Sequence, residues 1–462
     1  HEREDELVEY QAKANFRTLG KELGPLMKAA SVKIAELEQE AIQSILDGST
    51  LSIEVEGKNV ELTIEKIIVE RLEKANLKVV NDGTLTVALD SEITEELKLE
   101  GYVRDLVRGI QNLRKESGLA VTDRINLVLS GCEELNKAYS IFADAMKKSA
   151  TGYCCVFATK HRKATEMLMD LMENTGIISY VGKVNMDREA SEALTEESAD
   201  ISAYTTFGWI NAVKEKFPHT MPILTPRFIP CCTDKLMEEL REIQMAYGIP
   251  VQSHLSESKG EIDFVKFLRP DNAFYGDSYN EYDLFGKNDD IHTDVKTVMA
   301  HCVWSTKEEV ELMRKNGVFV AHCPASNMNL TSGIAPVRKY LDLGLNIGLG
   351  SDVAGGHSDS IFRAITDAIQ VSKMYFRMVD EAYRPLVFSE AFYLATKGGG
   401  AFFGKVGSFE EGYDFDAVVL DDAVFPHPQE LSIPERLERA VYLGADANGI
   451  RAKYVAGKQI ML

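Results

Sequence analysis

Seven short apolar runs, separated by helical patterns, restrict the fold of this 462-residue chain more than any other feature. Continuous apolar runs are typical of parallel strands buried on both faces. Their regular alternation with amphipathic helices indicates βαβ units and one parallel sheet. The fold class is therefore predicted as α/β, an incomplete (β/α)8 TIM barrel that lacks one of its eight strands. The runs are 152–159, 178–186, 222–228, 250–257, 297–303, 318–324 and 346–352.

Helical patterns fill the spaces between these runs, and two further strand patterns follow them. The runs 415–421 and 452–462 are expected to form a small flanking β-sheet beside the barrel. The expected helices are Ala164–Glu173, Asp234–Tyr247, Thr306–Asn316 and Ser360–Met378.

Several of the barrel runs end in a polar or ionisable side chain. The catalytic groups of a (β/α)8 barrel lie where its strands end, so these side chains are expected to form one cluster. The residues are Arg227, His254, Glu257, His301 and Asp352.

The chemistry of these side chains suits hydrolysis at a metal-bound water. A histidine such as His254 can bind a divalent metal through a ring nitrogen, and Glu257 can act as general base on the water. Asp352 can bind the metal or orient the water, and His301 can stabilise developing charge or carry a proton. For any one of these residues alone, a structural role or a solvated position at a strand end is at least as good an interpretation as a catalytic role. Their joint position at successive strand ends favours a site.

Other residues near the strand ends carry weaker signals. Arg227 could donate hydrogen bonds to a carbonyl group of a substrate, and Phe228 could stack on a planar ring. A surface ion pair beside a core aromatic residue is the equal alternative. His322 and Asn327 are expected to hold local backbone, and His161 is not expected to bind a ligand.

Residues 1 to about 137 follow a different pattern and are predicted to form a small α+β domain. A helical stretch at 16–45 precedes strand patterns at 51–57, 60–69 and 84–90, with Asp82-Gly83 as a hairpin turn. A long amphipathic helix over 94–114 and a strand over 125–130 follow. The segment contains no clustered nucleophile and base, which favours binding or scaffolding over catalysis.

Composition excludes several classes of function. The net charge of −21 argues against broad phosphate binding. No apolar run of about 18 residues is present, so no membrane span is expected. The seven cysteines include no C-x-x-C pair, which predicts reduced thiols and a cytoplasmic protein. The charged start, HEREDELVEY, is unlike a signal peptide, and a first residue other than Met is typical of a fragment.

The region from about 138 to 462 resembles the guanine deaminase family of the amidohydrolase superfamily. The resemblance lies in VGKVNMDR (181–188), ILTPRF (223–228), QSHLSE (252–257), MAHC (299–302), AHCPASN (321–327) and GLGSDVAGG (348–356). It implies a zinc-dependent barrel of strands two to eight with C-terminal sheet strands, which removes the amine of guanine to give xanthine and ammonia. It also implies a homodimer.

The resemblance gives each strand-end residue a role. His254 and Asp352 match zinc ligands, Glu257 matches the proton-carrying acid and base, and His301 matches the histidine beside the metal-bound water. Arg227 and Phe228 match residues that hold the purine, with His254, Glu257 and Asp352 also lining its site.

One family motif is absent from the sequence. The first barrel strand of this family carries an H-x-H pair that supplies two more zinc ligands, yet no two histidines here are two residues apart. Weak Zn²⁺ binding and little or no deaminase activity are therefore expected.

Residues 1 to about 137 resemble the C-terminal domain of isoleucyl-tRNA synthetases. The matching segments are NFRTLGKELG (15–24), VALDSEITEELKLEG (87–101) and VRDLVRGIQNLRKESGLAVTDRINL (103–127). The resemblance implies a tRNA contact, for which Arg104, Arg108, Arg114 and Lys115 are the candidates, although a solvated helix face is the preferred interpretation. Three alternatives stay open: an impaired deaminase, an RNA-contacting module joined to an inactive barrel, and a join produced by recombination or a misread gene.

Overall fold

The computed structural model describes residues 8–73, 77–82, 85–90, 146–191, 194–287 and 295–461. The chain divides into two compact units between Arg104 and Asp105. The domain boundary expected near residue 137 lies outside the described residues, as do the helix expected over 94–114 and the strand expected over 125–130. Each unit is considered by itself below.

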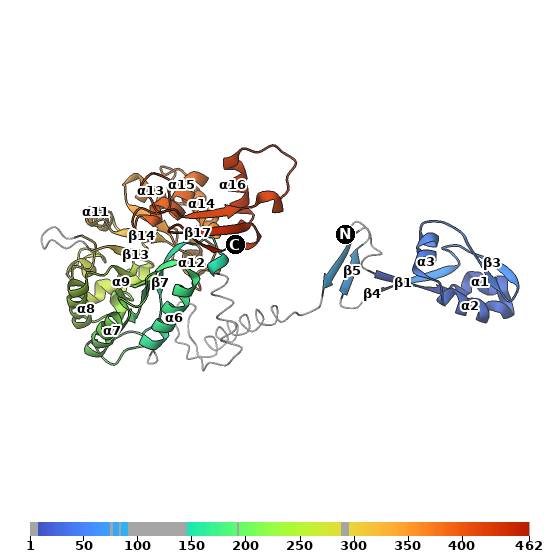
Figure 1. Cartoon of the computed structure of the whole chain (residues 1–462), viewed down its shortest axis with the longest axis horizontal. Coiled ribbons are helices and arrows are strands. Elements are labelled where there is room, and N and C mark those ends of the chain that lie inside the picture. Colours follow the sequence, from blue (N-terminus) through green and yellow to red (C-terminus); the bar gives the residue numbers. More distant parts are fainter. Residues whose placement is uncertain are drawn as a thin grey trace. The chain divides into compact units, whose positions relative to one another are not determined.

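The described residues of the first unit pack three helices and a short 3₁₀ turn against antiparallel strand pairs (Figure 1). The single helical stretch expected over 16–45 is wrong, because the chain breaks it twice. Gly24 has a φ of +50° and Pro25 follows, which ends the first helix after Leu23. The helical segments are α1 (Phe16–Leu23), η2 (Gly24–Leu26), α2 (Met27–Ala35) and α3 (Gln39–Leu46).

The strands described for the first unit form three antiparallel pairs, β1–β4, β2–β3 and β5–β6. The strand predicted over 60–69 is in fact the end of β3 and the start of β4, with a turn between them. Strands β5 and β6 pair antiparallel, with Asp82 as the last residue of β5, whereas the predicted turn residue Gly83 lies outside the described residues. Strand β1 was not predicted. Their bounds are β1 Val8–Ala14, β2 Leu51–Val55, β3 Lys58–Leu62, β4 Ile67–Glu73, β5 Leu77–Asp82 and β6 Leu85–Asp90. Leu19, Ile34, Ile45 and Leu62 lie fully buried in the core of this unit.

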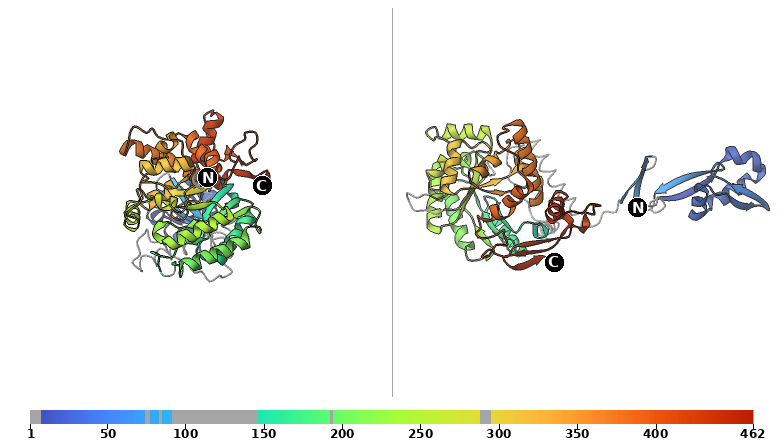
Figure 2. Two further views of the ribbon diagram at one scale, coloured as in Figure 1. Left: turned by 90° about the vertical axis from the view of Figure 1, so that its left-hand side faces the viewer. Right: turned by 90° about the horizontal axis from the view of Figure 1, so that it is seen from above.

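The second unit contains a parallel sheet enclosed by helices, which Figure 2 shows most clearly in its right-hand view. All seven predicted runs contain strands, and two of the runs are split into two short strands each. Parallel pairing joins β7 to β8, β8 to β10, β9 to β11, and β12 through β15 in order, while a bridge from Leu224 to Val251 links the two halves. The bounds are β7 Tyr153–Phe157, β8 Ile178–Gly182, β9 Val184–Asn185, β10 Thr220–Pro222, β11 Thr225–Pro226, β12 Val251–Leu255, β13 Thr297–His301, β14 Phe319–His322 and β15 Asn346–Leu349.

This order is that of a (β/α)8-type barrel. The described residues supply seven strand positions, in agreement with the sequence pattern, and the absence of an eighth stays a prediction. Gly182 illustrates the close packing within the barrel, because a Cβ atom there would collide with the side chains of Thr225 and Gln252.

Helices cover the outside of the barrel, and their ends follow local sequence signals. The side chain of Thr233 caps α8, and α6, α8 and α11 end at glycines with positive φ. Helices α7 and α9 were not predicted. The helices are α6 Arg162–Thr175, α7 Ala199–Val213, η3 Ile229–Cys231, α8 Asp234–Tyr247, α9 Lys259–Leu268, α10 Asp277–Asn280, α11 Lys307–Asn316, α12 Pro324–Asn329, α13 Val337–Asp342, α14 Ile361–Met378, α15 Phe388–Tyr393 and the π-helix η4 Leu394–Gly398.

The C-terminal segment adds a three-stranded antiparallel sheet in the order β16–β17–β18. Its strands fall within the two late runs of the sequence, except that β17 begins two residues earlier. The elements are β16 Ala417–Leu420, η5 Asp422–Val424, α16 Ile433–Tyr442, α17 Ala445–Asn448, β17 Ile450–Val455 and β18 Lys458–Met461. None of the helices in the described part of the chain is long and apolar enough to cross a membrane.

Candidate active site

The carboxyl ends of β12, β13 and β15 bring four of the predicted residues together. His254 lies on β12, His301 is the last residue of β13, and Asp352 follows β15. Glu257 lies two residues beyond β12. Because the three strands are parallel, their carboxyl ends meet at one end of the barrel, which is where catalytic groups are expected.

His254 is held in one orientation and one tautomer. Its ring is buried, and Nδ1 lies 2.7 Å from the carbonyl oxygen of Arg227. A carbonyl oxygen can only accept a hydrogen bond, so Nδ1 carries the proton and Nε2 is the nitrogen with a lone pair in the neutral ring. The ring centroid lies 5.4 Å from that of His301 at an interplanar angle of 19°, and 4.7 Å from that of Phe157.

His301 is the most enclosed residue of the group, with no exposed surface. Its backbone φ of +73° turns it away from the regular strand direction. Nδ1 donates to Oδ1 of Asn327 at 2.8 Å, which leaves Nε2 facing two carboxylates. The distances from Nε2 are 3.6 Å to Oε2 of Glu257 and 3.9 Å to Oδ2 of Asp352. In the described part of the chain Nε2 has no hydrogen-bond partner, so it is a buried polar atom available to a bound molecule.

Both carboxylates have fixed surroundings. The hydroxyl of Ser332 donates to Oε1 of Glu257 at 3.0 Å. Asp352 has a φ of +46°, and Gly355 lies so close that a Cβ atom there would come within 2.9 Å of Oδ2 of Asp352. The two side chains therefore approach His301 from separate loops.

Arg227 and Phe228 lie next to this group, beyond β11. Arg227 is buried, with Nη1 3.7 Å from the sulfur atoms of Met186 and Cys231. Its guanidinium carbon lies 5.3 Å from the ring centroid of Phe228, and that ring is 6.4 Å from the ring of His254. The two residues thus form an apolar and cationic wall beside His254.

The sequence interpretation missed or misjudged several side chains. Asn327 was expected to hold local backbone, but its side chain binds His301, so that expectation is wrong. Ser332 and Phe157 were not considered at all. No local signal identifies Ser332, whereas Phe157 could have been found as an aromatic residue near the end of the first barrel run. His161 is exposed and precedes the first residue of α6.

His322 is buried at the end of β14 beside this group. Burial, together with the smaller effect of the neighbouring His301, lowers its pKa from 6.5 to about 3. Its ring is therefore neutral at physiological pH. Neither ring nitrogen has a hydrogen-bond partner in the part of the chain that the structure describes.

The residues at the strand ends do not complete a metal site. A catalytic zinc ion normally takes three protein ligands. In the described ranges, no group of three His, Cys, Asp or Glu side chains is arranged to hold a metal ion. His254 and Asp352, the two predicted ligands, therefore lack a third within those ranges.

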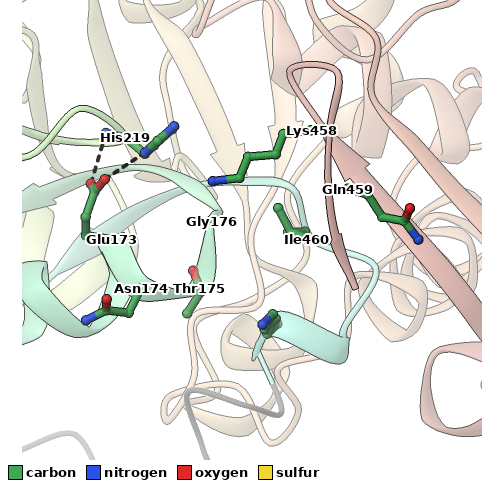
Figure 3. Close-up of a pocket in the computed structure, with 9 residues that line it drawn as sticks. Glu173, Asn174, Thr175, Gly176, His219, Lys458, Gln459 and Ile460 are labelled. Atoms are coloured by element: carbon green, nitrogen blue, oxygen red, sulfur yellow. Dashed lines mark hydrogen bonds and ion pairs between the residues drawn. The ribbon is translucent and has the colours of Figure 1, made fainter. Parts of the chain in front are cut away.

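A separate hollow lies at the opposite end of the barrel, near the amino ends of β8 and β10 (Figure 3). Glu173 and His219 pair at one side of it at 2.7 Å, and Ile460 of β18 packs beside Gly176. The remaining lining residues are Lys147, Asn174, Thr175, Lys458 and Gln459. None of the predicted site residues lines this hollow, so it is not part of the strand-end group.

The fold, together with the carboxylates and histidines at the strand ends, indicates the class of protein. Residues 111–460 match the model of the amidohydrolase family, and the chain belongs to that family and is a hydrolase by membership. More particularly, it is 36% identical to a guanine deaminase of Dictyostelium discoideum over 330 residues, which cover 70% of this chain and 71% of the relative. The structure of a guanine deaminase from C. acetobutylicum with bound guanine is 46% identical, with a TM-score of 0.66, covering 71% of this chain and 75% of that one.

An N-terminal segment has a different relative. It is 61% identical over 150 residues to an isoleucine–tRNA ligase of Treponema denticola. The match covers 31% of this chain but only 14% of the ligase. The chain therefore joins a small part of a ligase-like sequence to most of an amidohydrolase, as the two sequence resemblances indicated.

Proposed function

We propose that the second unit binds guanine at the ends of β12, β13 and β15 and catalyses its hydrolytic deamination slowly. The observation that carries this proposal is the position of buried His301, with Nε2 facing Glu257 and Asp352. The relatives named above support guanine as the substrate. In this proposal Arg227 and Phe228 hold the purine, and His254 and Asp352 line its site.

The proposed reaction needs one residue that moves protons. Water adds to the ring carbon that carries the exocyclic amine, and Glu257 takes the proton that the water loses. Glu257 then returns a proton to the amine, the carbon–nitrogen bond breaks, and ammonia leaves xanthine behind. Nε2 of His301 faces the added oxygen in this proposal, and Ser332 keeps the carboxylate of Glu257 in place.

Slow turnover follows from the incomplete donor set. The family relies on Zn²⁺, and His254 and Asp352 are the two residues of this chain that would contribute to its binding. The sequence has no H-x-H pair, and the described residues offer no cluster of three donors. Two ligands bind zinc far more weakly than three or four, so we propose that the water is poorly activated.

Guanine binding is tested by titration calorimetry of the whole chain. Phe228→Ala should weaken binding by about tenfold, because it removes the aromatic wall beside His254. Phe267→Ala is the matched control, since Phe267 is 78% exposed at the end of α9 and far from the proposed wall in sequence. Equal affinity of both variants, or no binding by the unmodified chain, would contradict the proposal.

A second candidate function concerns the first unit. The 61% identity to an isoleucine–tRNA ligase favours a weak tRNA contact through residues 1 to about 137. The candidate cations Arg104, Arg108, Arg114 and Lys115 lie outside the described residues. A binding curve for tRNA at increasing salt concentration tests this function, because phosphate contacts weaken as salt rises. Absence of binding at low salt would rule it out.

Two further features belong to the same proposal. The six cysteines in the described part of the chain are all free thiols, which suits the reducing cytoplasm. The relatives favour a homodimer, and sedimentation at micromolar concentration tests that expectation directly.

A further inference from the structure

The turn that leads from β12 to Glu257 has an unusual backbone at Ser256. This residue has a φ of +46°, in the left-handed region that costs a residue with a side chain about 1–2 kcal/mol. Its side chain is buried, and its carbonyl oxygen accepts a hydrogen bond from the amide of Trp304 at 2.9 Å. Such a conformation persists only where the surroundings hold it.

A buried carboxylate holds this turn. The hydroxyl of Ser256 donates to Oε2 of Glu309 at 2.8 Å, and the amide of Gly276 donates to Oε1 at 2.6 Å. Glu309 has no exposed surface, and burial raises its pKa. A buried carboxyl group is costly unless hydrogen bonds satisfy it, and here both oxygens are satisfied by the turn and its neighbour.

The position of Glu309 in its helix makes this arrangement more notable. Glu309 is the third residue of α11, and Thr306 caps that helix by accepting from the amide of Glu309. A glutamate at this position commonly bonds back to the amide of the capping residue. Glu261 of α9 does so, forming a full capping box with Ser258. Glu309 instead directs both carboxylate oxygens away from the start of its own helix.

Gly276 has no side chain, and this leaves room for the contact between its amide and Glu309. A Cβ atom at Gly276 would lie 2.9 Å from the ring of Phe285 and 3.2 Å from Oε1 of Glu309. A side chain at this position would therefore push the amide away from the carboxylate. Three separate elements, the end of β12, the start of α11 and the segment before α10, thus meet at Glu309.

We propose that Glu309 is a positioning residue that fixes the turn at Ser256 and thereby directs Glu257 toward His301, an inference that rests on the proposed function of Glu257. Glu309 does not touch the substrate in this proposal. It acts through one hydrogen bond to Ser256, and Glu257 follows directly in the chain. The hydroxyl of Ser332 also holds the carboxylate of Glu257 through a hydrogen bond.

The first test is a double-mutant cycle on guanine affinity, measured by calorimetry. Glu309→Leu should weaken binding about tenfold or more in the unmodified chain, but should have no further effect in a Glu257→Gln background. Glu309→Gln should retain most of the affinity, because its amide can accept from Gly276 and donate to Ser256. Glu311→Leu, on the exposed face of the same helix, is the control and should bind as the unmodified chain does. Equal losses in both backgrounds would show a general structural role and overturn the proposal.

The second test does not depend on guanine. A crystal structure of Glu309→Leu should show Ser256 outside the left-handed region and the contact of Glu257 with His301 lost. Ser256→Ala, which removes the same hydrogen bond, serves if Glu309→Leu does not fold. An unchanged turn and an unchanged Glu257 would overturn the proposal. If the unmodified chain binds no guanine, the proposed function fails, while this structural comparison still decides the role of Glu309.

Discussion

At the scale of single residues, the geometry of the candidate site depends on contacts between distant parts of the chain. His254, His301 and Asp352 end apolar runs, and the parallel order of those runs places them together. The positive φ of His301 and the hydrogen bond from Ser332 to Glu257 depend on loops from other parts of the chain. Neither has a local sequence signal, because residues such as serine and histidine occur at such positions without a fixed pattern.

His322 gives a prediction about pH at this scale. Its pKa is about 3 in the folded chain and 6.5 in the unfolded chain, so below pH 6.5 the unfolded chain binds a proton that the folded chain does not. Stability should therefore fall as pH decreases from 6.5 toward 3, by about 2 kcal/mol between pH 7 and pH 5. His322→Leu removes this contribution. Urea unfolding at both pH values should show a smaller loss in the variant, and an equal loss in both proteins would exclude the assignment.

At the scale of elements, apolar runs predicted strands better than periodicity predicted helices. The expected strand runs of the second region all contain strands, because buried parallel strands keep a continuous apolar pattern. Helix α7 was missed, since its apolar residues surround the helix and leave no clear polar face. The prediction of one helix over 16–45 did not take account of Gly24-Pro25, a strong signal in the sequence for the end of a helix.

Lys453 gives a prediction about how the C-terminal sheet is attached. Its buried amine, on β17, donates to the carbonyl oxygens of Met146, Ser149 and Thr151 at 3.3, 2.9 and 3.0 Å. Lys453→Met keeps much of the length of the side chain but removes the amine from all three acceptors, of which the carbonyl oxygen of Met146 keeps other donors, the amide and hydroxyl of Ser149. The loss should be about 2–4 kcal/mol, because unsatisfied buried polar groups are costly. Urea unfolding of the second unit measures it, with the exposed Lys458→Met as control, and a loss no larger than the control would contradict this account.

At the scale of the whole molecule, the two units have separate hydrophobic cores within the described residues. Each core is formed by residues of its own unit, so each unit should unfold as its own cooperative transition. Scanning calorimetry should therefore show two transitions. Leu19→Ala, in the core of the first unit, should move one of them and leave the other unchanged. A single transition that shifts as a whole would contradict independent units.

The central proposal concerns the second unit: Arg227, Phe228 and Glu257 are proposed to hold the purine and carry protons, while the described residues offer no complete set of metal ligands. The most direct test follows the loss of guanine absorbance with purified protein that has been incubated with Zn²⁺. We predict turnover at least about a hundredfold below that of an intact guanine deaminase assayed beside it, because two protein ligands would hold zinc weakly and would leave water poorly activated. Turnover near that of the intact enzyme would contradict the proposal.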